Sequence, residues 1–119
     1  MGDEAAVERH LPLRPVEFQI LVGLGRGPTH GYALLQAARE RAGAVVPGLA
    51  TLYRALQRLE HRGLLEQQPT EGEDPTDERR RAFRLTPLGR RVASAEARRL
   101  SDLVELARAG ALLEGEGGS

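Results

Sequence analysis

Glycine and proline residues cut this chain of 119 residues into short segments whose order leaves few folds open. Apolar residues recur at helical spacing in three of these segments, and each segment is bounded by Gly or Pro. The periodicity predicts helices over 15–24, 30–42 and 49–62. Pro15 suits the first helical position, Gly48 can cap the third helix, and Gly63 suits a left-handed stop after it.

A hairpin and a long helix follow these three segments. Two runs with strand character, 64–68 and 80–86, flank an acidic stretch rich in turn-forming residues. Thr86 and Pro87 are typical of a helix start, and the pattern predicts one long helix over 87–109. The sequence therefore predicts an α+β, mostly α fold: a winged helix-turn-helix of three helices and a two-stranded wing, with a long C-terminal helix.

The chain is long enough for one domain with tails. We expect a flexible N-terminal tail over 1–10, the winged helix-turn-helix domain over 11–86, a dimerisation helix over 87–110 and a flexible tail over 111–119. The last helix has more apolar surface than a small winged core needs, which favours a homodimer. Its candidate dimerisation residues are Leu88, Val92, Leu100, Leu103 and Ala107.

Composition argues against several classes of function. There is no Cys, which excludes disulfides and thiolate metal sites, and the three His residues lack metal-ligand spacing. No Ser stands beside a base in a triad pattern. We therefore predict a protein that is not an enzyme and has no cofactor, no metal and no catalytic residue. With no apolar run near 18 residues and no signal sequence, we expect a cytoplasmic protein without membrane contact.

The formal net charge of zero conceals a strong local separation of charge. Five acids lie between positions 71 and 78, whereas six arginines and no acid lie between 79 and 91. Such a local field matters more for a charged partner than the total charge does. Arg79, Arg80 and Arg81 could enter a minor groove of DNA, or they could simply neutralise the acidic loop beside them.

The third predicted helix has an arginine stripe, Arg54, Arg58 and Arg62, opposite its leucines. An amphipathic helix that packs through Leu and exposes Arg suits a major groove lined with hydrogen-bond acceptors. The alternative is a solvated face on an ordinary amphipathic helix. The six arginines that follow favour the DNA interpretation.

Three motifs in this order resemble one protein family. His30-Gly31-Tyr32 opens the second helix, Thr51-Leu52-Tyr53-Arg54-Ala55-Leu56 lies in the third, and Arg84-Leu85-Thr86-Pro87-Leu88-Gly89 links the wing to the last helix. The set is similar to the PadR family of bacterial transcriptional regulators, in its compact branch with a single C-terminal helix, over roughly residues 13 to 109.

The resemblance implies a homodimeric winged-helix repressor that binds a palindromic operator in double-stranded DNA, released by a small aromatic effector. It implies that Thr51 and Tyr53 approach DNA phosphates. His30 is also expected to pack or bond at its helix start. The alternative is a winged-helix module that binds protein and no DNA. The candidate DNA-binding residues are Thr51, Tyr53, Arg54, Arg58, Arg62, Arg79, Arg80, Arg81, His30 and Tyr32.

Overall fold

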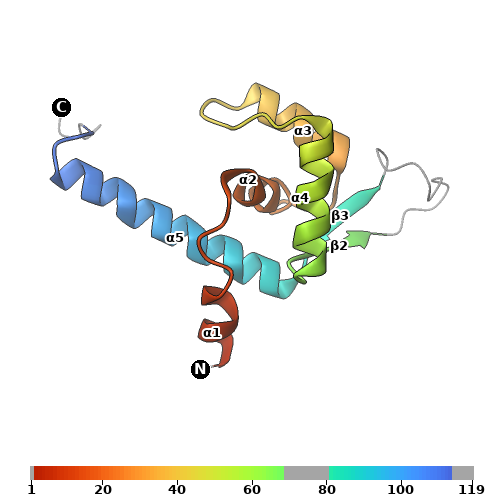
Figure 1. Cartoon of the computed structure of the whole chain (residues 1–119), viewed down its shortest axis with the longest axis horizontal. Helices are drawn as coiled ribbons and strands as arrows, with labels where there is room; N and C mark the ends of the chain where they lie inside the picture. Colours follow the sequence, from red (N-terminus) through yellow and green to blue (C-terminus); the bar gives the residue numbers. More distant parts are fainter. Residues whose placement is uncertain (1, 69–80, 114–119) are drawn as a thin grey trace.

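The computed structural model describes residues 2–68 and 81–113, which form five helices and three short strands (Figure 1). The helices are α1 (Gly2–Glu8), α2 (Pro15–Gly23), α3 (Gly31–Glu40), α4 (Leu49–His61) and α5 (Pro87–Ala109). The strands are β1 (Thr29–His30), β2 (Leu65–Gln68) and β3 (Ala82–Leu85). The helix-turn-helix is made by α3 and α4, and the predicted fold class is confirmed.

Local signals place the helix ends where the sequence predicts them. Gly48 is the N-cap of α4, and Gly63 follows its end with φ +76°. The backbone N–H of Leu64 donates to the carbonyl of Leu59, which closes the Schellman motif typical of a glycine stop. At α5, the Thr86 hydroxyl accepts a hydrogen bond of 2.9 Å from the backbone N–H of Gly89.

The sheet has three strands rather than the two expected. Its order is β1-β3-β2, with antiparallel pairing throughout. Thr29 pairs with Phe83, and His30 pairs with Ala82. A strand of two residues directly before a helix has no periodicity of its own, so only the tertiary pairing with β3 defines β1.

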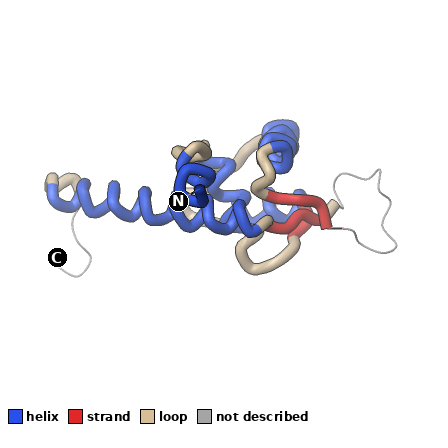
Figure 2. The backbone as a smooth tube through the Cα atoms, turned by 90° about the horizontal axis from the view of Figure 1, so that it is seen from below, coloured by secondary structure: helices blue, strands red, loops and turns tan. Residues whose placement is uncertain are grey.

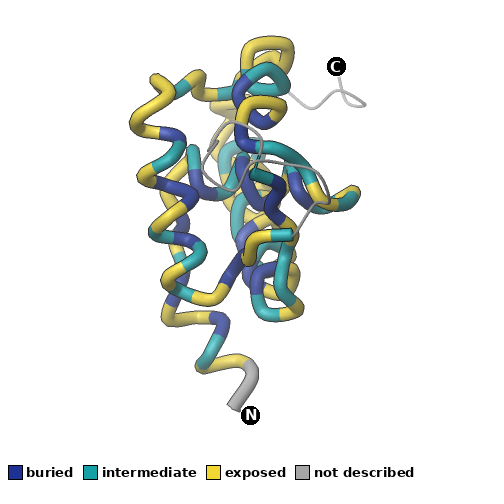
Figure 3. The backbone as a smooth tube through the Cα atoms, turned by 90° about the vertical axis from the view of Figure 1, so that its right-hand side faces the viewer, coloured by how far each residue is buried: buried dark blue, intermediate teal, exposed yellow. Residues whose placement is uncertain are grey.

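The core lies where α2, α4 and the start of α5 meet the sheet. Its largest buried side chains are leucines, with a contribution from α5 at the fully buried Val92. Figure 3 shows buried positions alternating with exposed ones along the helices. Two apolar residues of the predicted helices over 30–42 and 49–62 are not buried: Ala42 lies beyond the end of α3 and is exposed, and Leu49 is 42% exposed in the first turn of α4.

The expected N-terminal tail contains a helix. Residues Gly2–Glu8 form α1, which packs against α5. Val7 and His10 are buried, so most of the segment 1–10 is part of the folded unit. Isolated helices of this length are unstable in water, and α5 supplies the surface that stabilises α1. Residues 114–119 of the expected C-terminal tail lie outside the described residues.

The second half of α5 extends past the other helices (Figure 2). Leu103, Val104 and Leu106 are exposed there, with Leu106 at 68%. Among the candidate dimerisation residues, Val92 is fully buried and Leu88 packs against the same core. Val92 therefore belongs to the protomer's own core, which corrects its assignment to a dimer contact, whereas Leu88 keeps a partly exposed side chain. Leu100 and Ala107 are partly exposed.

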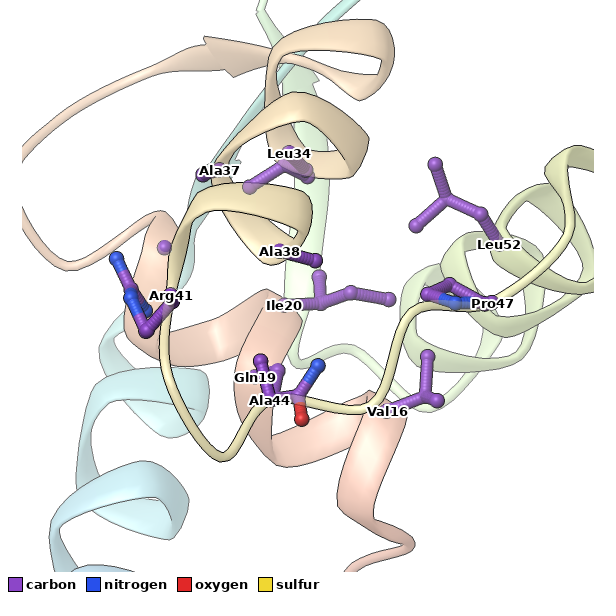
Figure 4. A pocket seen from close by; sticks show the side chains of 11 residues that line it. Val16, Gln19, Ile20, Leu34, Ala37, Ala38, Arg41, Ala44, Pro47 and Leu52 are labelled. Carbon is purple, nitrogen blue, oxygen red and sulfur yellow. The ribbon is translucent and has the colours of Figure 1, made fainter.

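The connection between α3 and α4 is held in place by one glutamine. Gln19 of α2 donates through Nε2 to the Val45 carbonyl at 2.8 Å and accepts from the Val45 N–H at 2.6 Å. The connection lies over a small apolar pocket to which Val16, Ile20 and Leu34 contribute (Figure 4). These contacts fix where α4 begins.

Candidate nucleic-acid interface

One face of α4 is buried and the other faces solvent. Leu52, Ala55, Leu56 and Leu59 are buried, as the leucine stripe predicts. From Thr51 onward, the exposed positions are Thr51, Arg54, Gln57 and His61. Glu60 is only partly exposed, and its carboxylate accepts a hydrogen bond from the Gln67 side chain of β2. The exposed face of this helix is therefore basic.

The three arginines of the stripe differ in their contact with a buried carboxylate that packs against α4. Glu17 of α2 is only 3% exposed, and Oε1 accepts the backbone N–H of Arg14 at 3.1 Å. Its Oε2 accepts Nε of Arg58 at 3.2 Å and Nη1 of Arg62 at 3.3 Å. Burial alone raises the pKa of the Glu17 carboxyl, but the hydrogen bonds from Arg14, Arg58 and Arg62 outweigh it, so that the pKa is lowered.

Arg62 points inward, contrary to its predicted place in an exposed stripe. Besides its contact with Glu17, it donates through Nε to Nδ1 of His10 and through Nη2 to the His10 carbonyl, both at 3.3 Å. All three guanidinium nitrogens thus bind the protein itself. Burial, followed by the charges of Arg62 and Arg9, lowers the pKa of His10, as expected for an imidazole that must accept a hydrogen bond while neutral.

Arg54 and Arg58 face outward to different degrees. Arg54 is exposed and donates to the Thr51 hydroxyl at 3.4 Å. The side chain of Arg58 is 38% exposed, and only its Nε is bound to Glu17. Both arginines line a shallow hollow on the α4 surface, together with Gln57, His61 and part of Arg62. This hollow is the basic part of the candidate interface.

The HGY motif positions the start of α3 against α4. A Cβ at Gly31 would lie 3.1 Å from the Tyr53 ring, so the glycine allows this ring to pack closely on α3. Tyr53 is half-buried, whereas Tyr32 is 44% exposed and its hydroxyl accepts a hydrogen bond of 2.9 Å from Gln36. His30 is the residue before α3 and belongs to β1.

Of the three wing arginines predicted to bind DNA, the structure describes only Arg81. Arg79 and Arg80 lie outside the described residues, as does the acidic loop. Arg81 is partly exposed, and its carbonyl accepts the Gly31 N–H. Arg84 forms an ion pair of 2.7 Å with Glu66 across the sheet, so it is partly neutralised within the wing.

A second buried carboxylate, not singled out by the sequence, stands on α5. Glu96 is 1% exposed, and its Oε2 accepts the backbone N–H of Leu13 at 2.8 Å. Its other partner is Arg99, whose hydrogen bonds are the main reason that the pKa of Glu96 is lowered. The only signal in the sequence is the spacing of four from Val92, which places Glu96 on the buried face of the helix.

The helices α2, α3 and α4 and the three-stranded sheet form a winged helix-turn-helix, and α4 carries the arginines. Residues 20–95 match the model of the transcriptional regulator PadR-like family. The chain belongs to this family, which confirms the resemblance of its motifs. Proteins of this family are transcription regulators and not enzymes.

One sequence relative and two solved structures are similar to this chain. The chain is 38% identical over 84 residues to an uncharacterized 37.1 kDa protein in transposon TN4556 from Streptomyces fradiae; this covers 71% of the chain. The match spans only 22% of that relative's length. A PadR family transcription regulator from Clostridium difficile R20291 has a similar structure, with a TM-score of 0.68 at 20% identity over 80% of this chain and 96% of that one.

Bacillus subtilis PadR, solved in complex with operator DNA, is also similar in fold. Its TM-score is 0.60 at 22% identity, over 71% of this chain and 46% of that one.

Within the described part of the chain, every helix is too short or too polar to cross a lipid bilayer.

Proposed function

We propose that this PadR-family regulator is a repressor that binds a palindromic operator as a homodimer in the cytoplasm. The observation that carries the proposal is the exposed face of α4, which bears Arg54 and part of Arg58 while its one acid, Glu60, is turned to Gln67. A helix of this kind suits the major groove of DNA. The similarity in fold to a relative solved with operator DNA supports it.

Within this proposal the candidate residues divide by position. Arg54 and Arg58 face the groove from α4, while Thr51 and Tyr53 approach phosphates near its start. His30 and Tyr32 contribute from the start of α3, and Arg79, Arg80 and Arg81 from the base of the wing. Arg62 supports the interface from behind, because its three nitrogens are bound to Glu17 and His10.

The exposed half of α5 supports the homodimer. Leu103 and Leu106 lie three residues apart on a helix that extends beyond the protomer's own core. An isologous contact through this half would make a two-fold dimer, and two α4 helices would then match two half-sites. A small aromatic effector that alters this dimer would release the operator.

Selection from a randomised duplex library, followed by gel-shift titration, tests the proposal. We expect an inverted repeat whose half-site centres lie about one helical turn, or a multiple of it, apart. Affinity should fall steeply between about 50 and 200 mM salt, because arginine contacts release counterions from phosphate. Recovery of no preferred sequence, together with salt-independent binding, would favour the alternative of a module that binds protein instead of DNA.

A further inference from the structure

Glu17 is a buried acid in contact with the helix that faces DNA. Its side chain is 4% exposed and contacts two arginines of α4, Arg58 and Arg62. An ionised carboxylate is costly to bury unless it is paired and hydrogen-bonded. Arg62 and the backbone N–H of Arg14 already supply a cation and a hydrogen bond. The hydrogen bond from Arg58 adds to these contacts and joins Glu17 to the part of α4 that faces solvent.

The contact with Arg58 uses only one edge of its guanidinium. Nε donates to Oε2 of Glu17 at 3.2 Å. Within residues 2–68 and 81–113, the two Nη groups of Arg58 have no hydrogen-bond partner, and the side chain lines the basic hollow on α4. Arg62 differs, because its Nε and both Nη groups are bound within the protein.

A guanidinium held at Nε keeps a pair of Nη donors for another partner. The guanine edge in the major groove presents two acceptors, O6 and N7, to which arginine binds in a bidentate manner. A planar fork matches this edge only in a restricted orientation. A contact that fixes the orientation before binding reduces the conformational entropy lost in the complex.

We propose that Glu17 is a positioning residue for base recognition: it holds Arg58 by Nε so that the Nη pair is presented to a guanine in the major groove. This inference rests on the proposed DNA-binding function and adds a specificity determinant outside the arginine stripe. Phosphate contacts carry no sequence information. Loss of the Glu17 carboxylate is therefore expected to lower the ratio of the affinity for operator DNA to the affinity for random DNA.

Glu17→Gln isolates the charge at this position. Glutamine can still accept the Arg14 N–H at the third helical position, so the start of α2 is preserved. Glu96→Gln is the matched control, because Glu96 is also buried, also accepts a backbone N–H and also pairs with an arginine, but that arginine is Arg99 of α5. Both variants change the net charge equally.

The probes are a duplex of about 30 base pairs selected by the wild-type protein from a random library, and a shuffled duplex of the same composition. For Glu17→Gln we expect the affinity ratio of selected to shuffled duplex to fall roughly 5-fold or more. Arg58→Ala should lower the ratio at least as much, and the double variant should lower it no further than Arg58→Ala alone. Glu96→Gln should keep the wild-type ratio.

Circular dichroism establishes that each variant is folded. If Glu17→Gln does not fold, Glu17→Asp serves in its place, because it keeps the charge but retracts the carboxylate from Arg58; we expect its ratio to fall too. The inference about Glu17 would be overturned by an unchanged ratio in Glu17→Gln, by an equal fall in Glu96→Gln, or by additive effects in the double variant. None of these outcomes would overturn the proposed DNA-binding function. Equal wild-type affinity for both duplexes would overturn the proposed function, and this inference with it.

Discussion

Replacement of Gly89 by alanine should strongly destabilise the protein. Gly89 lies in the first turn of α5, directly over the carbonyl of Leu64. A Cβ at this position would lie 1.8 Å from that oxygen and 2.7 Å from the carbonyl carbon, whereas real Cβ contacts essentially never fall below 3.0 Å. The obstacle is backbone, which no change of rotamer can remove. The start of α5 would therefore have to move by more than about 1 Å.

The cost follows from the contacts around this turn. Movement strains the hydrogen bonds from the Thr86 hydroxyl to the Gly63 carbonyl at 2.6 Å and from the Thr86 N–H to the Leu64 carbonyl at 3.3 Å. Each is worth about 1 kcal/mol, and overpacking adds about 1–3 kcal/mol. The better helix propensity of alanine returns at most about 1 kcal/mol. We expect the free energy of unfolding to fall by roughly 2–4 kcal/mol.

Thermal and denaturant unfolding, followed by circular dichroism at fixed protein concentration, measures this loss. For a domain of this size the midpoint should fall by at least about 8 °C. Gly110→Ala is the matched control at the other end of α5, where the nearest atom would be 3.6 Å from the new Cβ. It should change stability by less than about 1 kcal/mol. A midpoint for Gly89→Ala within about 2 °C of the wild type would refute the reasoning.

Three further predictions concern association, acid stability and DNA recognition. Sedimentation should show twice the 13.0 kDa mass of one chain; Leu103→Glu should favour the monomer and Ser101→Glu, on another side of α5, should not, and equal behaviour of the two would contradict a dimer through Leu103. Burial and neighbouring arginines lower the pKa of His10 below 6.5, so below about pH 6.5 the unfolded chain takes up a proton before the native one and stability falls. A second loss of stability follows below about pH 4.5, because the pKa values of Glu17 and Glu96 are also lowered in the native state. Denaturant titrations across this range should show a smaller first loss in His10→Ala, and the same pH profile in wild type and variant would contradict the role of His10. Arg58→Ala should lower the ratio of operator to random affinity, while Arg80→Ala should weaken both affinities alike; an unchanged ratio for Arg58→Ala would remove this side chain from base recognition.

Features set by a few neighbouring residues could be predicted from the sequence. The Gly63 stop, the Gly48 cap and the Thr86–Pro87 start each depend on the conformation or hydrogen bonding of residues within one helical turn. The order of these signals was enough to predict the winged helix and the position of α4.

Features that depend on a distant partner could not be predicted. The strand β1 exists because Thr29 and His30 pair with β3, and α1 exists because α5 supports it. The arginine stripe shows the limit most clearly. A helical wheel places Arg62 opposite the leucines, but it contains no information that Glu17 and His10 lie on that flank. For the same reason Val92 was assigned to a dimer contact instead of the protomer's own core.

The hydrogen bond from the Leu13 N–H to Glu96 joins residues 83 positions apart in a chain of 119. During synthesis the N-terminal segment leaves the ribosome first, and its acceptor is made only when most of the chain is complete. The segment that contains His10 and Leu13, and through which His10 contacts Arg62, therefore cannot form all of its native hydrogen bonds before α5 is synthesised. Contacts between residues so distant in sequence cost more loop-closure entropy than local contacts do. A chain that ends before Glu96 would lack the hydrogen bond that fixes the segment of His10 and Leu13 beside Arg62 of α4. The proposed DNA-binding helix therefore reaches its native surroundings only once the last helix has been made.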